Sequence, residues 1–243
     1  MAHYHLCLVL RGVLYTTIKF NVFLRSIEQS VKKSISSFMT RPYRWSIAAA
    51  TVILLCLLSY IFTDIKAALW FHTINKGWYS DLFNIITDFG ESQWYLIAGM
   101  LVFIVFRKTN ELRADSGLFL SLSVAASGVS ADIIKYIAGR ARPILYFSEQ
   151  VYGFNSFHYE YQWISFPSGH AATAFSAAIV LTILYPKGRF FFLFAGTLIA
   201  FSRIFLTHHY ISDVIAGSFL GITSSILLYN LYFKRKFDVS ESR

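Results

Sequence analysis

A histidine and an aspartate stand one helical turn apart near the C-terminal end of the chain. His209 and Asp213 are four residues apart, and side chains at this spacing lie on the same face of a helix. Asp213 can therefore accept a hydrogen bond from Nδ1 of His209, which fixes the tautomer and leaves Nε2 free to act as a nucleophile. A lone histidine is more often inert, so this interpretation depends on what surrounds the pair.

A second histidine follows a short segment that suits anion binding. The sequence Pro167-Ser168-Gly169-His170 is typical of a helix start, where backbone N–H groups are unpaired and the helix dipole is positive. Gly169 allows an anion to approach the backbone closely, and Ser168 can cap the helix or donate to a phosphate oxygen. Such a segment also starts many ordinary helices, so the motif predicts a phosphate site only together with other residues.

Three cations are expected at the same end of the predicted helices. Lys135 and Arg142 are seven residues apart, which is nearly two helical turns and places them on one face. Arg203 lies at the matching end of another predicted helix. Lysines and arginines at helix ends commonly extend toward water, and that explains any one of the three. Three of them beside two histidines indicate a bound anion.

A metal site is the main alternative reading of these residues. His170, His208, His209 and Asp213 could be imagined as ligands. However, the three cations would repel a divalent ion, and the His-Glu-x-x-His spacing does not occur. We therefore predict neither a metal nor a cofactor.

The elements that position these residues are predicted to be membrane helices. The 243 residues are 56% hydrophobic and only 14% charged, whereas soluble domains carry roughly 25% charged residues. The net charge of +9 could suggest a nucleic-acid partner, but a basic arm or stripe is missing from the sequence. In a chain this apolar, basic residues more often lie in cytoplasmic loops.

The predicted fold class is all-α, a bundle of six transmembrane helices preceded by an amphipathic interfacial helix over 20–39. A spanning helix needs about 20 apolar residues, and the interfacial helix is indicated by apolar residues at steps of three to four among basic ones. We expect a basic N-terminal segment over 1–44, a membrane domain over 45–233 and a basic tail over 234–243. The predicted spans are 45–63, 93–106, 117–139, 169–185, 190–206 and 210–233.

The distribution of basic residues predicts the orientation of these spans. Most of the 22 lysines and arginines fall in the N-terminal segment, the second-to-third loop, the fourth-to-fifth loop and the tail. The side richer in basic residues faces the cytoplasm. Both termini are then cytoplasmic, and the loops around 140–168 and 207–210 face the outer side.

At this point the sequence resembles a known family, the type-2 phosphatidic acid phosphatase superfamily. Its three-part signature is matched in order and with the right internal spacing, across residues 135–213. The matching motifs are Lys135-x6-Arg142-Pro143, Pro167-Ser168-Gly169-His170 and Ser202-Arg203-x5-His209-x3-Asp213. Arg140 and His208 are not part of this signature, and the sequence assigns them no role.

The resemblance implies a role for each matched residue. His209 would attack phosphorus and form a phosphohistidine, Asp213 would orient it, and His170 would protonate the leaving oxygen and then activate water. The phosphoryl oxygens would be bound by the remaining positions, Lys135, Arg142, Ser168, Gly169 and Arg203.

The function implied is that of a metal-independent lipid phosphatase in a bacterial inner membrane, with its site on the outer face. Candidate substrates are undecaprenyl pyrophosphate, phosphatidylglycerol phosphate, phosphatidic acid and a lipid A phosphate, and the bilayer itself is the other partner. A lipid phosphotransferase using the same phosphohistidine is an alternative that needs the same residues. A transporter is disfavoured because transport sites normally lie at mid-membrane and often between repeats, whereas these polar residues lie at one end.

Overall fold

The computed structural model describes residues 42–241, with side chains over 43–238. The predicted interfacial helix over 20–39 and most of the 1–44 segment lie outside the described residues. The chain divides into two compact units, Met1–Ile47 and Ala48–Arg243. Of the first unit, only the start of helix α2 is described.

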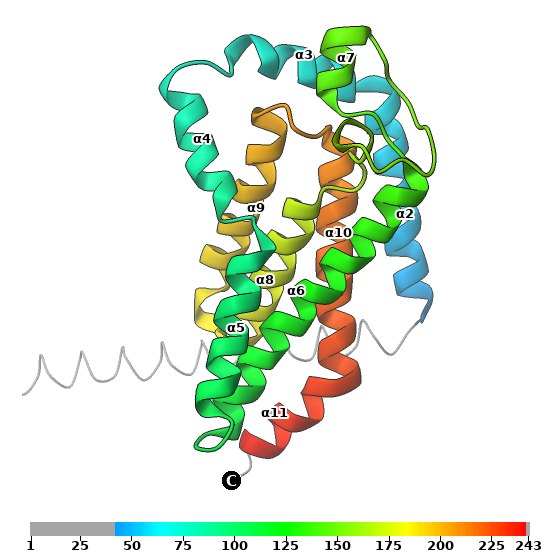
Figure 1. Ribbon diagram of the computed structural model, residues 1–243. Coiled ribbons are helices and arrows are strands. Elements are labelled where there is room, and N and C mark those ends of the chain that lie inside the picture. The colour runs from blue at the N-terminus through cyan, green and yellow to red at the C-terminus, as the bar shows by residue number, and fades with distance from the viewer. Residues whose placement is uncertain (1–41, 242–243) are drawn as a thin grey trace, which may run out of the picture. The chain divides into compact units, whose positions relative to one another are not determined.

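Within residues 42–241, every regular element is helical (Figure 1). The only β-type pairing in that range is an isolated bridge between Arg140 and Phe154. Short 3-10 turns lie at Tyr161–Trp163 and Pro186–Gly188, and a π-helical turn at Tyr229–Phe233 joins α10 to α11. The α-helices are α2 (Pro42–Phe62), α3 (Asp64–Ile74), α4 (Trp78–Asp88), α5 (Ser92–Phe106), α6 (Glu111–Ala138), α7 (Pro143–Glu149), α8 (Gly169–Leu184), α9 (Arg189–Phe205), α10 (Ile211–Leu228) and α11 (Lys234–Glu241).

Five helical segments in the described range are long and apolar enough to cross a membrane. They carry many exposed large apolar side chains, and only 6% of the most apolar stretch of the first is buried. Lipid is the environment in which such surfaces are stable, so the chain is an integral membrane protein. The segments are Tyr43–Phe62, Trp78–Phe106, Glu111–Ala138, Pro186–Phe205 and Ile211–Asp238.

The predicted count of six spans is not confirmed, because the helix expected over 169–185 is shorter than the others. Helix α8 has 16 residues, which corresponds to a rise of about 24 Å. It packs against α6, α9 and α10, and its alanines, such as Ala171 and Ala177, are almost fully buried. Protein therefore surrounds this helix where lipid surrounds α2. The second predicted span is longer than expected, because α4 precedes α5 in one apolar segment.

Glycines bring α10 close to the beginning of α8. A Cβ atom at Gly217 would collide with the carbonyl oxygen of Ser168, and one at Gly221 with that of Ala172. Small residues allow such backbone approach between membrane helices. In addition, the N–H of Ser168 donates to the carbonyl oxygen of Asp213 over 2.9 Å. The second and third sequence motifs are thus joined backbone to backbone.

The segment between α6 and α8 lies over the same end of the bundle as the start of α8 (Figure 1). Its return path is fixed by main-chain bonds from Arg142 N to Gln162 O at 2.8 Å and from Ser165 N to Arg140 O at 3.0 Å. Helix α7 in this segment contacts α3, where Phe147 stacks on His72 with ring centroids 4.2 Å apart. These contacts hold the residues after α6 against the segment that leads into α8, and α7 against α3.

Candidate active site

His209 lies in the short connection between α9 and α10. The main-chain N–H groups of His208 and His209 both donate to the carbonyl oxygen of Arg203, over 3.0 and 3.2 Å. These bonds close the end of α9 and turn the chain, so that the imidazole of His209 is buried with 3% exposure. The residue predicted to be the nucleophile is therefore held by the same helix end that carries Arg203.

Asp213 faces His209 from the first turn of α10. Its Oδ2 lies 3.6 Å from Nδ1 of His209, which is longer than a hydrogen bond. That oxygen accepts from the Ser165 hydroxyl at 2.6 Å and from the Tyr210 N–H at 2.9 Å. The two predicted partners are thus brought together, with the Ser165 hydroxyl 3.5 Å from the same imidazole nitrogen.

The cation cluster, defined as Lys135, Arg142 and Arg203, has two members without an ion-pair partner among the described residues. Arg142 stacks 3.9 Å above the ring of Tyr161 and donates to its hydroxyl at 3.1 Å. Arg203 donates to Thr87 at 2.8 Å. Both arginines are 6% exposed, and buried charges are normally paired. Lys135 differs, because it contacts Asp132 at 3.2 Å.

The start of α8 completes the arrangement. A Cβ atom at Gly169 would lie 3.0 Å from Nζ of Lys135, so the lysine reaches the exposed backbone at this helix start. Ser168 caps the helix by accepting from the N–H of Ala171 at 3.4 Å. His170 follows in the first turn, half-buried, beside Gly90 at the end of α4.

Electrostatics show that these groups surround one imidazole. The pKa of His209 is lowered well below its ordinary value, first by burial and then by the charges of Arg142, Arg203, Lys135 and His170. The neighbouring His208 has its pKa lowered to about 4 by burial and by the two arginines. His209 therefore stays neutral near pH 7, with a lone pair available for nucleophilic attack.

Sequence reasoning missed a second group of buried charges, here called the Arg140 network and defined as Asp64, Arg140 and Asp213. Arg140 is 1% exposed. It donates through Nη1 to Oδ1 of Asp213 and through Nη2 to Oδ2 of Asp64, the latter over 2.7 Å. Burial alone would lower the pKa of Arg140, but the two carboxylates outweigh it and raise that pKa above its ordinary value. A carboxylate directly after an apolar span, as at Asp64, was the available signal.

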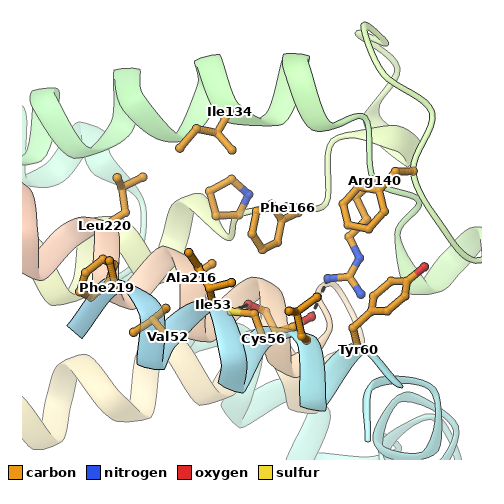
Figure 2. A pocket seen from close by; sticks show the side chains of 15 residues that line it. Val52, Ile53, Cys56, Tyr60, Ile134, Arg140, Phe166, Ala216, Phe219 and Leu220 are labelled. Atoms are coloured by element: carbon orange, nitrogen blue, oxygen red, sulfur yellow. Dashed lines mark hydrogen bonds between the residues drawn. The ribbon is translucent and has the colours of Figure 1, made fainter. Parts of the chain in front are cut away.

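An apolar cavity of about 560 Å³ lies beside the Arg140 network, between α2 and α10 (Figure 2). Figure 2 shows Arg140 and Tyr60 at one end of it, with Phe219 and Leu220 at the other. Ser212 also lines this cavity, whereas the two histidines and the cation cluster do not. Of the Arg140 network, Arg140 is the member that lines the cavity.

A comparison with family models matches residues 116–237 to the PAP2 superfamily. The chain belongs to this superfamily. Two relatives named lipid A 1-phosphatase, from Rhizobium johnstonii and Rhizobium etli, are 31% and 30% identical over 59% and 63% of the chain. The matches span 64% and 71% of those two proteins, so the chain covers less than two thirds of the first. An undecaprenyl-diphosphatase from Sulfolobus acidocaldarius is 28% identical over 56% of this chain and 62% of its own length.

Two solved structures resemble this PAP2 chain in fold. A transmembrane PAP2-type phosphatidylglycerolphosphate phosphatase from Bacillus subtilis matches with a TM-score of 0.57, at 23% identity, over 76% of this chain and 96% of its own. LpxE from Aquifex aeolicus matches with a TM-score of 0.51, at 19% identity, over 68% and 93%. At these identities the likeness establishes the fold, while the chemistry has to come from the residues.

Proposed function

We propose that this PAP2 protein is a metal-independent lipid phosphatase that works through a phosphohistidine at His209. One observation carries the proposal: a buried neutral histidine is surrounded by the cation cluster, of which Arg142 and Arg203 are unpaired among the described residues. A phosphate ester supplies the missing negative charge. Phosphoryl transfer depends mainly on positioning and charge stabilisation, and fixed cations can perform both tasks.

The reaction has two steps on one pocket. In the first, Nε2 of His209 bonds to phosphorus while the bond from phosphorus to the lipid oxygen breaks, and His170 gives its proton to that oxygen. In the second, His170 takes a proton from water, the resulting hydroxide bonds to phosphorus, and the bond to His209 breaks. Lys135, Arg142, Arg203, Ser168 and the Gly169 N–H would bind the phosphoryl oxygens in both steps.

The substrate class is a phosphorylated membrane lipid. Lipid A 1-phosphate comes first in a substrate panel because two relatives carry the name lipid A 1-phosphatase. Undecaprenyl pyrophosphate, phosphatidylglycerol phosphate and phosphatidic acid complete the panel. All four present a phosphate at the membrane surface, where the charged end of the bundle would meet it.

The test is phosphate release from this panel by the purified protein in detergent with EDTA present, beside His209→Ala prepared in parallel. We expect release from at least one lipid by the wild type and none by the variant. Activity that EDTA abolishes and one divalent ion restores would overturn metal independence. Phosphate passed to an added acceptor lipid, without release to water, would instead identify a phosphotransferase.

We also propose six membrane crossings with both termini in the cytoplasm and the site on the outer face. The domain limits follow the same scheme: a basic segment over 1–44, a membrane domain over 45–233 and a basic tail over 234–243. Support comes from the excess of Lys and Arg in the segments assigned to the inner side. Single cysteines at positions 155 and 187, in a variant without Cys7 and Cys56, test the orientation. A membrane-impermeant reagent applied to intact cells should label position 155 and spare 187, and the reverse pattern would contradict the proposal.

A further inference from the structure

The Arg140 network contains two carboxylates and one guanidinium, all inaccessible to water. Arg140 also donates to Ser212 Oγ at 2.6 Å and to the Tyr152 hydroxyl at 3.2 Å. Bonds of this kind, with both partners charged, are short and directional. Arg140 lies outside the family signature, so its burial between two acids needs its own explanation.

The two oxygens of the Asp213 carboxylate have different hydrogen-bond partners. Oδ1 is bonded to the guanidinium, while Oδ2 is bonded to Ser165 and the Tyr210 N–H and faces Nδ1 of His209 at 3.6 Å. A carboxylate held through only one oxygen can rotate about its terminal bond. With both oxygens held, the one that faces the histidine keeps its position.

Asp64 holds the other side of the guanidinium and the start of α10. Its Oδ2 pairs with Arg140, and its Oδ1 accepts from the main-chain N–H of Ser212 at 3.1 Å. The hydroxyl of Ser59 adds a further bond to Oδ1 at 2.7 Å. A carboxylate at a helix N-terminus also interacts favourably with the helix dipole. Asp64 thus links the end of α2 to the helix turn that contains Asp213.

We propose that Arg140 and Asp64 are positioning residues for the His209–Asp213 pair. This inference rests on the proposed function. They touch neither phosphate nor leaving group; they hold Asp213 so that it can orient the imidazole of His209 and stabilise the positive charge that develops on it as the bond to phosphorus forms.

If Arg140 and Asp64 only stabilised the fold, a double variant would behave differently than if they position Asp213. The double variant therefore distinguishes the two roles. Arg140→Gln alone leaves two buried carboxylates without their cation, so its unfolding temperature should fall steeply. Arg140→Gln combined with Asp64→Asn removes one charge of each sign and leaves Asp213 as the single buried carboxylate of the network, so part of the lost stability should return. A structural role predicts that both stability and activity recover in the double variant.

A positioning role predicts that only stability recovers. With an aryl phosphate substrate, kcat of the double variant should stay about 10- to 100-fold below wild type, the scale known for losing the hydrogen-bond partner of a metal-ligating side chain. KM should change less than about twofold, because the cation cluster is untouched; a loss in kcat without a change in KM reports on the reacting groups. Rapid-quench measurement should show slower formation of the phosphoenzyme on His209.

Arg140→Lys provides a test that does not depend on the double variant folding. An ammonium keeps the charge but cannot reach Asp64 and Asp213 through one rigid plane, so we expect the same loss of kcat. The matched control is Tyr152→Phe, which removes one contact each of Arg140 and Asp64 but none of Asp213. It should retain wild-type kcat, because the bonds from Arg140 to both carboxylates remain.

Wild-type kcat in Arg140→Lys, or in a double variant of recovered stability, would overturn the positioning role. A wild-type protein that forms no phosphoenzyme at all would overturn the proposed function instead. The two failures are distinguishable because the second appears before any variant is made.

Discussion

Arg140 and Arg142 are two residues apart in the chain, but Arg140 belongs to a network that contains carboxylates and Arg142 to a cluster of cations. The guanidinium of Arg140 is bonded to two carboxylates. That of Arg142 stacks on a tyrosine ring, and its hydrogen-bond partners among the described residues are all neutral. Both are almost completely buried. The guanidinium of Arg140 has its counter-ions within the protein, whereas under the proposed function the cation cluster obtains its counter-ion when a phosphate binds. Burial alone therefore does not distinguish a structural arginine from one that binds a ligand. The presence or absence of a counter-ion within the protein distinguishes them.

The strongest expected effect separates the two histidines beside the cation cluster. His209→Ala should form no phosphoenzyme with any substrate. His170→Ala should still form one with an aryl phosphate, whose leaving group needs no proton, while losing about 10²- to 10⁴-fold with a lipid phosphate. It should then hydrolyse the intermediate slowly, because the base for water is missing. Rapid-quench detection of phosphohistidine measures both, and a phosphoenzyme in His209→Ala but not in His170→Ala would exchange the roles.

The next effect is a difference in unfolding temperature between variants of the cation cluster and variants of the Arg140 network. Arg203→Gln should abolish most activity yet raise the unfolding temperature in phosphate-free buffer, because it removes one of several buried like charges. A gain of about 1 kcal/mol corresponds to roughly 2–4 °C in a chain of this size. Arg140→Gln should shift the temperature downward. The comparison fails if the two variants shift it in the same direction, and differential scanning fluorimetry in detergent measures both.

A related substitution keeps the positive charge at position 203 but removes the planar guanidinium group. Arg203→Lys should lose much of the activity, because a guanidinium can bind phosphate through two parallel hydrogen bonds and an ammonium cannot. Vanadate, which can mimic five-coordinate phosphorus, should inhibit the wild type and raise its unfolding temperature more than that of this variant. Wild-type activity in Arg203→Lys would remove Arg203 from the phosphate site.

A moderate effect is expected in the pH profile. The pKa of His209 is lowered, first by burial and next by Arg142, so His209 takes up a proton only well below pH 6.5. The acid limb of kcat/KM for an aryl phosphate, corrected for ionisation of the substrate, should accordingly lie below pH 6.5. Arg142→Gln removes a positive neighbour and should move that limb to higher pH. An unmoved limb in this variant would show that another group titrates.

The smallest effect concerns an ion pair at the opposite end of α6. Lys236 contacts Asp115 at 2.6 Å, with side-chain exposures of 37% and 18%. Because water screens such a pair, Lys236→Gln should cost about 0–1 kcal/mol and leave kcat and KM unchanged. Unfolding and activity assays on this variant therefore provide the baseline for the Arg140 variants.

The residues of the proposed phosphate site could be found in the sequence because their motifs are local. Helix geometry predicted one shared face for Lys135 and Arg142 and another for His209 and Asp213. The structure corrects this, because α6 ends at Ala138 and α10 begins at Ile211, so each pair lies across a helix end. Lys135 and Arg142 nevertheless both act on the charge of His209, and Asp213 faces it. The Arg140 network was not predictable, because Asp64 meets Arg140 across 76 residues and no periodic pattern encodes that meeting. The predicted hydrogen bond from His209 to Asp213 is not formed at 3.6 Å, and the facing oxygen accepts from Ser165 and the Tyr210 N–H.

The helical architecture was predicted in outline from composition and apolar runs. The span over 93–106 was too short in the prediction because polar residues near Asp88 interrupt the apolar run, while the structure continues it through α4. Helix α8 reads as an ordinary span in sequence because alanine is apolar in either setting. Only its packing shows that other helices, rather than lipid, surround it.

The backbone contact at Gly217 and Gly221 has a consequence for how this protein can diverge. The two halves of the site meet through main-chain atoms, at a separation that leaves room for hydrogen and nothing larger. Substitutions on the lipid-facing surfaces of α2, α5 and α9 leave that contact between α8 and α10 unaltered. The outer surface can therefore change without altering the site, whereas a side chain at Gly217 or Gly221 would push the start of α8 away from α10 and from His209.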